Sequence, residues 1–180
     1  MSFARRTVSR SPIVFTLFLG VGGFFASVMA PNAEDPVSYK VFFSLIFFAV
    51  MLTMFLWLGA IYRLGATVRQ MPPSWAPAYV LAPACMAIVG TLVGYKTTVG
   101  EPMFASLLRS GIGIFVLASV WKSAEAMETA LDGTGARIGR IVRTAGYLFF
   151  SIVGIWVLRD RLLKLCELAE PQIAGSSEVS

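Results

Sequence analysis

The chain consists of five long apolar runs joined by short polar connections, and this pattern leaves few folds open to it. The runs are Pro12–Ala30, Val41–Tyr62, Ala76–Tyr95, Met103–Trp121 and Thr144–Leu158. About 20 residues of helix span a hydrocarbon core of roughly 30 Å. Because lipid offers no hydrogen-bond partner to the backbone, such runs cross a bilayer as helices and not as open strands. The pattern predicts an all-α fold, an integral membrane bundle of five transmembrane helices.

Composition favours the same fold class. Of the 180 residues, 57% are hydrophobic and 14% are charged, and the mean hydropathy is +0.74. Soluble domains use apolar residues for nearer half of their length. Because the connections are too short for a separate soluble domain, we expect residues 1–170 to form a single membrane domain. Residues 171–180 are small and polar, which predicts a disordered tail.

The last run is the shortest, and its path is ambiguous. As a helix, Thr144–Leu158 measures about 22 Å, so it needs a thinned membrane or help from its flanks to cross. With the N-terminus inside, five crossings place nine Lys and Arg residues inside and five outside, which agrees with the positive-inside rule. A re-entrant or interfacial last segment places twelve inside and two outside. We predict five crossings and keep four crossings plus such a segment as the alternative.

The first run also has features of a signal peptide. Three arginines precede it, and it ends in Val28–Ala30, which resembles a small-residue cleavage site. The next residue, Pro31, is expected to obstruct cleavage, and the run is long enough to span the bilayer unaided. We therefore expect a retained helix with a cytoplasmic N-terminus.

The sequence lacks the residues that several classes of binding site and reaction require. The sequence contains no histidine, which removes bis-His haem ligation and His-containing metal sites. All ten Asp and Glu residues lie in predicted connections, at helix ends or in the tail, whereas ion-coupled transporters usually need an intramembrane carboxylate. We expect no cofactor, no metal and no catalysis. A lipid-modifying enzyme would need a loop carboxylate such as Glu125 or Glu128 as its base.

A pI near 9.6 raises the question of nucleic-acid binding. In a multi-pass chain a basic excess is the ordinary mark of cytoplasmic loops beside anionic lipid headgroups. We therefore expect the lipid bilayer as a partner, together with other membrane subunits or further copies of the chain, and no nucleic acid.

Arg109 is the one ionisable residue inside a predicted span. Three roles fit an arginine at this depth. Its side chain can reach the outer headgroups, pair with another helix or a partner subunit, or line a path for a substrate or ion.

Small residues at helical spacing favour close packing of helices. The third run contains a GxxxG pattern, the first run contains its small-xxx-small relative, and two glycines follow Arg109 in the fourth. Packing within the chain and docking of a partner are both open to such faces. The candidates for helix packing or partner contact are Gly22, Ala26, Gly90, Gly94, Arg109, Gly111 and Gly113.

The segment after the fourth run predicts a helix that continues into the cytoplasm. Lys122 and Glu125 are helical neighbours in it, and Gly133 is placed to end it. Three arginines then lie on one side of the next helical segment, opposite three apolar residues, a pattern that suits contact with anionic lipid headgroups. The arginines are Arg137, Arg140 and Arg143, and the apolar residues are Ile138, Ile141 and Val142.

The residues from Leu117 to Leu165 resemble a family of uncharacterised small bacterial multi-pass membrane proteins. The resemblance rests on the segments WKSAEAME and GIWVLRDRLLKL. The chain departs from the family pattern in lacking a proline before Gly154 and in having Arg159-Asp160-Arg161 in place of Gln-Pro-Arg. The resemblance implies a bacterial inner membrane and carries no activity.

Two functional hypotheses follow. The first is a non-catalytic multi-pass protein, an accessory or structural subunit of a membrane complex that acts through helix packing and lipid contact. The alternative is a small uncoupled channel or carrier, a homo-oligomer with Arg109 in an anion path.

Overall fold

The computed structural model describes residues 36–93, 103–133 and 135–177, and every regular element in these ranges is a helix. The predicted all-α class is therefore confirmed, whereas the first predicted run lies outside the described residues. The helices are α3 (Val37–Val68), α4 (Ala76–Val93), α5 (Met103–Asp132), α6 (Ile138–Phe149) and α7 (Ser151–Ser177).

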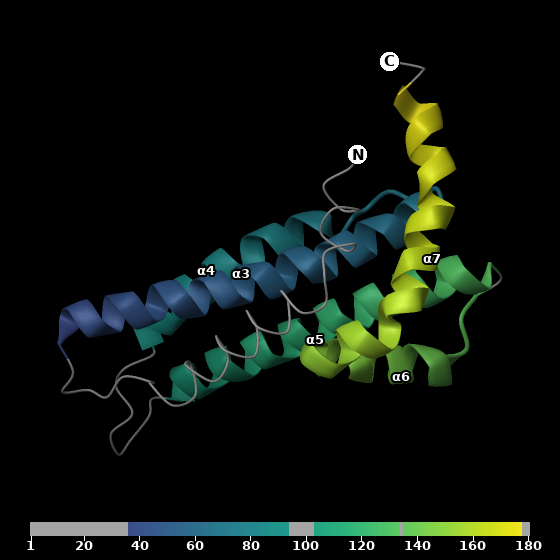
Figure 1. The fold of residues 1–180 in the computed structure, drawn as a ribbon. Coiled ribbons are helices and arrows are strands. Elements are labelled where there is room, and N and C mark those ends of the chain that lie inside the picture. Colours follow the sequence, from purple (N-terminus) through teal and green to yellow (C-terminus); the bar gives the residue numbers. More distant parts are fainter. Residues whose placement is uncertain (1–35, 94–102, 134, 178–180) are drawn as a thin grey trace.

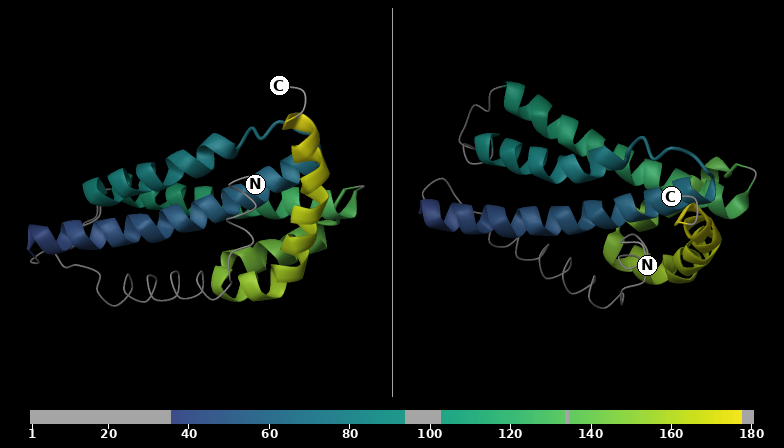
Figure 2. Two further views of the ribbon diagram at one scale, coloured as in Figure 1. Left: turned by 45° about the horizontal axis from the view of Figure 1, so that its top comes forward. Right: turned by 90° about the horizontal axis from the view of Figure 1, so that it is seen from above.

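Three long helices form the body of the fold. Helices α3 and α5 run in the same direction and α4 runs against them, so that all three lie roughly along the long axis of the molecule (Figure 1). Helix α6 turns back beside the C-terminal half of α5. Helix α7 then crosses the bundle near the ends of α3 and α5, as the two further views confirm (Figure 2).

The hydrophobic core lies at the end of the bundle that α7 crosses. It combines the second half of α3, where Phe55, Leu58 and Ile61 are fully buried, with Met127 of α5 and Leu165 of α7. The first half of α3 is different, because Val41, Phe42 and Leu45 are exposed there. Among the described side chains, packing is thus concentrated at this end of the bundle.

Two glycines of α3 bring neighbouring helices into close contact. A Cβ atom added at Gly59 would lie 2.9 Å from the Cβ of Tyr79 in α4, and one added at Gly65 would lie 2.6 Å from the carbonyl oxygen of Ala126 in α5. Neither distance leaves room for a methyl group. Glycine at these positions lets α3 approach α4 and α5 on two different faces.

One helix in the described part of the chain is long and apolar enough to cross a membrane. This is α3, while residues Ala76–Met86 of α4 form a shorter apolar helix. The described residues therefore support an all-helical fold and leave the number of crossings open.

The prediction of one continuous helix over Thr144–Leu158 is wrong. Helix α6 ends at Phe149 and α7 begins at Ser151, because Phe150 adopts φ −86° and ψ 57°, outside the helical region. Gly154 then packs so tightly on the Tyr147 carbonyl group that an added Cβ would overlap it. The run forms a tight corner between two helices.

The C-terminal segment also differs from the prediction. Helix α7 passes through Pro171 and ends at Ser177, so most of the predicted disordered tail is helical. The buried positions Leu165, Cys166 and Ala169 continue the apolar face of α7 up to this segment.

The predicted continuation of the fourth helix beyond Trp121 is confirmed. Helix α5 continues without a break from Met103 to Asp132. Gly133 follows it with φ +71°, and its N–H group donates to the carbonyl oxygen of Thr129 at 3.2 Å. A left-handed residue after the last turn is the usual way for a helix to end in glycine.

Candidate functional site at the junction of α5, α6 and α7

A buried carboxylate joins three helices at one point. Glu128 lies in helix α5 and has no exposed surface, so the expectation of a loop carboxylate at this position is wrong. Arg161 of α7 donates from Nη2 to Glu128 Oε2 at 2.7 Å and also contacts Oε1, and the hydroxyl group of Thr144 in α6 donates to Oε1. The continuation of α5 past Trp121 is what carries this carboxylate into the junction.

The buried charge of Glu128 restricts how the three helices can be arranged at this junction. A carboxylate removed from water loses its hydration, so it requires both a counter-charge and hydrogen bonds to remain ionised. Arg161 supplies the charge, and its side chain is 36% exposed. The group therefore fixes the relative positions of the three helices.

Two further ion pairs lie along α5. Arg140 of α6 pairs with Asp132 in the last turn of α5. Lys122 pairs with Glu125 at 2.8 Å, which confirms the predicted helical neighbours. With Thr144 on Glu128, the Arg140 pair sets the register in which α6 lies against α5.

A second polar cluster ties α3, α4 and α5 together inside the core. The Tyr79 hydroxyl group donates to the Ser119 carbonyl oxygen at 2.8 Å and shares a hydrogen bond of 2.8 Å with the Ser123 hydroxyl group. Ser123 also donates to the carbonyl oxygen of Leu58 at 3.1 Å. Each buried hydroxyl group has a partner, as burial requires.

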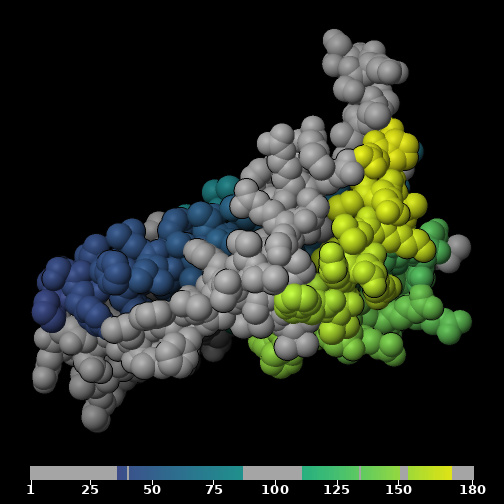
Figure 3. All heavy atoms as spheres, in the orientation of Figure 1, coloured from purple at the N-terminus to yellow at the C-terminus, as the bar shows by residue number. Residues whose placement is uncertain are grey.

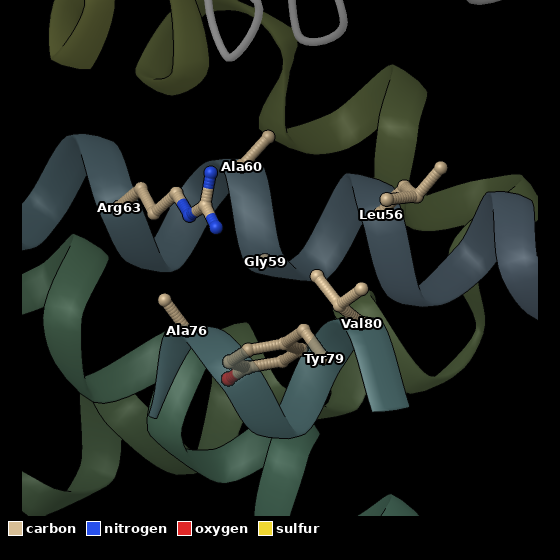
Figure 4. Close-up of a pocket in the computed structure, with 7 residues that line it drawn as sticks. All are labelled: Leu56, Gly59, Ala60, Arg63, Ala76, Tyr79 and Val80. Atoms are coloured by element: carbon tan, nitrogen blue, oxygen red, sulfur yellow. The ribbon is translucent and has the colours of Figure 1, made fainter. Parts of the chain in front are cut away.

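The hollow between α3 and α4 is small. Its cavity volume is about 40 Å³, enough for a few water molecules and too little for an organic substrate. Figure 4 shows Tyr79 and Val80 on the α4 side and Arg63 at the rim on α3. The hollow lies next to Gly59, where α3 and α4 make their closest approach.

The surface of α6 carries three different stripes. At about 100° per residue, the buried residues Ile141, Thr144 and Leu148 fall on one face. Two separate exposed stripes flank it. One is apolar (Ile138, Val142 and Phe149), and the other carries Arg140 and Arg143.

The predicted lipid-facing arrangement of α6 is therefore corrected in one position. The sequence pattern predicts Ile141 on the same side as Ile138 and Val142, opposite the arginines. The structure buries Ile141 in the core and leaves the other two exposed. Arg137 precedes the helix and is exposed.

Most of the predicted candidates for helix packing or partner contact lie where the structure describes no side chains. Gly22, Ala26 and Gly94 lie outside the described residues, and Gly90 and Arg109 lie in α4 and α5 at positions where the structure does not describe side chains. Gly111 and Gly113 are exposed, and a Cβ atom at either would meet no described atom within 4 Å.

The close-packed glycines found in the structure are ones that the spacing pattern missed. Gly59 and Gly65 face two different helices, and they are not spaced four residues apart as a GxxxG pattern would require. Gly154 packs on the preceding helix across a corner that the sequence reads as a continuous run. The sequence alone does not distinguish these glycines from Gly111 and Gly113, which also lie within a long apolar helix and are exposed.

The described residues contain no group of three or more His, Cys, Asp and Glu side chains placed to bind a metal ion. Comparison with protein-family models, with curated proteins and with solved structures finds no match to this chain.

Proposed function

We propose that this chain is a multi-pass protein of a bacterial inner membrane, with a cytoplasmic N-terminus, that serves as a non-catalytic structural or accessory subunit of a membrane complex. It acts by helix packing and lipid contact. The arguments are the outward apolar surface of its long helices and the rigid polar junctions at one end of the bundle.

The observation that carries the membrane placement is the exposure of α3. In its most apolar 18-residue window, 22% of the residues are buried inside the molecule. A comparably apolar helix in a soluble protein is a core helix and would be mostly buried. The outward apolar side chains of α3 therefore favour lipid or further apolar helices as their surroundings, which supports the membrane placement.

The neighbouring helices present the same kind of surface. Val80 and Leu81 of α4 and Ile114 and Leu117 of α5 are exposed, in addition to the first half of α3. The ionic junction of Glu128 lies at the opposite end of the bundle from the start of α3 (Figure 1). The ionic junction and the exposed apolar residues thus lie in different parts of the bundle. This arrangement supports a protein whose helices are held together at the junction and contact lipid or partner helices through their apolar surface.

The corner at Phe150 supports four crossings with a non-spanning last segment. A chain that reverses between α6 and α7 returns toward the side from which it came, whereas a span must continue across. The resulting arrangement places twelve Lys and Arg residues inside and two outside. We therefore propose the runs beginning at Pro12, Val41, Ala76 and Met103 as the spans.

Membrane fractionation and gentle purification test this proposal. We expect the chain to stay in the pellet after alkaline carbonate washing and to elute from a mild detergent as a stoichiometric assembly with itself or with another membrane protein. Recovery in the aqueous fraction would contradict the membrane placement. A monodisperse monomer, in detergent and in nanodiscs alike, would contradict the subunit role.

A further inference from the structure

The corner between α6 and α7 exposes large aromatic side chains. Phe149 and Phe150 are 49% and 68% exposed, and their rings meet edge to face with centroids 5.4 Å apart. Trp156, one turn into α7, is about half exposed. Figure 3 shows α6 and the part of α7 that follows residue 153 together on the outer surface of the molecule. A surface of this kind is costly to leave in water.

The contacts between α5 and α6 determine how deep this corner lies. The helices are antiparallel, and Thr144 of α6 is level with Glu128 of α5 through their hydrogen bond. Along the axis of α6, Thr144 and the corner at Phe150 are about 9 Å apart. Along the axis of α5, Glu128 and Trp121 are about 10 Å apart. The corner is therefore level with Trp121, the residue at which the fourth apolar run ends.

Trp121 marks a particular layer of the bilayer. It is 39% exposed on the bundle surface, and tryptophan concentrates where hydrocarbon meets the headgroups. Phenylalanine rings at the same level have the same apolar layer within reach. The corner thus has the depth and the composition of an interfacial anchor.

Arg143 supplies a positive charge farther from the apolar layer than the aromatic corner. Arg143 is exposed on α6, about 10 Å from Phe150 along the helix axis. It forms no ion pair with a described residue, whereas its neighbour Arg140 is engaged by Asp132. Each headgroup layer is roughly 5–8 Å thick. The guanidinium group of Arg143 therefore has the phosphates within reach when the rings enter the boundary.

From this order of groups, we propose that the Phe149–Phe150 corner is seated in the cytoplasmic headgroup layer of the bilayer and that Arg143 binds the phosphate of an anionic phospholipid there. This inference rests on the proposed membrane location. Aromatic rings at the boundary, followed outward by a cation, reproduce the layering of a phospholipid surface. The net charge of +5 complements an anionic leaflet.

Spin labels at three depths test the position of the corner. In a background of Cys85→Ser and Cys166→Ala, single labels replace Phe150, Leu117 on the apolar surface of α5 and Lys164 on the exposed side of α7. The full chain is reconstituted in phosphatidylcholine nanodiscs with phosphatidylglycerol. The measured quantity is the ratio of collisions with oxygen to collisions with a water-soluble nickel complex, which rises with depth.

We expect the ratio at position 150 to be several-fold higher than at 164 and lower than at 117. Equal ratios at 150 and 164 would place the corner in water and overturn the inference. A water-like ratio at 117 would instead overturn the membrane location itself, so the two failures can be told apart.

The role of Arg143 is tested by lipid composition. Addition of phosphatidylglycerol to phosphatidylcholine discs is expected to reduce the mobility of the label at 150, and Arg143→Gln is expected to abolish this reduction. Arg159→Gln, an exposed arginine on α7, is the matched control and should retain it. Free inorganic phosphate with phosphatidylcholine alone should not substitute. A lipid response that persists in Arg143→Gln, or that free phosphate reproduces, would overturn the assignment to a lipid phosphate.

Discussion

The carboxylate of Glu128 links three helices because Thr144 donates to it from α6 and Arg161 from α7. Such a pair contributes little net stability compared with a well-packed apolar residue, but loss of one partner leaves a charge buried without compensation. The side chain therefore acts mainly on specificity, by allowing one arrangement of α5, α6 and α7.

Replacement of Arg161 tests this view. We expect Arg161→Gln to lower the free energy of unfolding by about 2 kcal/mol, less than a fully buried pair would lose because Arg161 is partly exposed. The corresponding fall in melting temperature in mild detergent is about 4–8 °C. Glu128→Gln in the same chain should recover part of the loss, since it removes the uncompensated charge.

Arg159→Gln on the neighbouring exposed position is the control and should change stability by less than about 0.5 kcal/mol. A loss in the double variant equal to the sum of the two single losses would contradict coupling between Glu128 and Arg161.

Glycine substitutions separate packed from open positions along the helices. Gly65→Ala is expected to destabilise the fold by about 1–3 kcal/mol, because its methyl group would press on the Ala126 carbonyl oxygen. Gly111→Ala is expected to be neutral or stabilising by up to about 1 kcal/mol, because alanine favours helix and meets no described atom within 4 Å. Thermal unfolding of both variants in one detergent measures the difference, and equal effects would contradict it.

At the scale of helices, much of the fold was predictable from the sequence and some of it was not. Uniformly apolar runs identified α3, α4 and the first part of α5, and charge spacing with Gly133 predicted the extension of α5. The corner at Phe150 was hidden because both sides of it are apolar, so hydropathy shows no break there. The partner of Glu128 was also hidden, since Arg161 is distant in sequence and the two meet only after α6 and α7 fold back.

The same lesson applies to the candidate site residues. Spacing patterns pointed to Gly111 and Gly113 for helix packing or partner contact. Both are exposed in the described part of the chain, so the choice between these two roles stays a prediction, since small-residue patterns do not identify which face meets a neighbour. The arginines before and within α6 were found from charge alone. Their division into Arg140, paired with Asp132, and the exposed Arg143 required the helix positions.

Gly154 tests the corner as a unit. We expect Gly154→Ala to open the α6–α7 corner, because the added methyl group would overlap the Tyr147 carbonyl group. Spin-label distances between α6 and α7 should lengthen and broaden, with a loss of stability of at least about 2 kcal/mol. Gly146→Ala, where no described atom lies within 4 Å of the new Cβ, is the matched control and should leave the distances unchanged.

At the scale of the whole molecule, the crossing of α7 near the ends of α3 and α5 decides the topology (Figures 1 and 2). Helix α7 carries charges of both signs along its exposed side, among them Asp160, Lys164 and Glu167. Such a helix suits an aqueous surface and not a hydrocarbon one. Both ends of the chain should then lie on the same side of the membrane.

Labelling of single cysteines measures on which side of the membrane each end of the chain lies. In the cysteine-free background, Lys164→Cys should react with a membrane-impermeant maleimide in inverted vesicles and stay unmodified in intact cells. A cysteine placed at Ser2 should behave in the same way. Labelling of position 164 from outside intact cells would instead support five crossings.

The unbroken length of α5 has a mechanical consequence. Its last part extends about 16 Å beyond Trp121, and α6 is fastened to it by Arg140 and Thr144. A tilt of α5 by about 10°, of the order that a change in bilayer thickness produces, would swing Asp132 sideways by nearly 3 Å. The start of α6, which Arg140 fastens to Asp132, is expected to swing with it, whereas the α6–α7 corner lies level with Trp121 and should move less. In the proposed membrane setting, a change in the tilt of α5 would therefore shift the α5–α6 end of the protein relative to the headgroups.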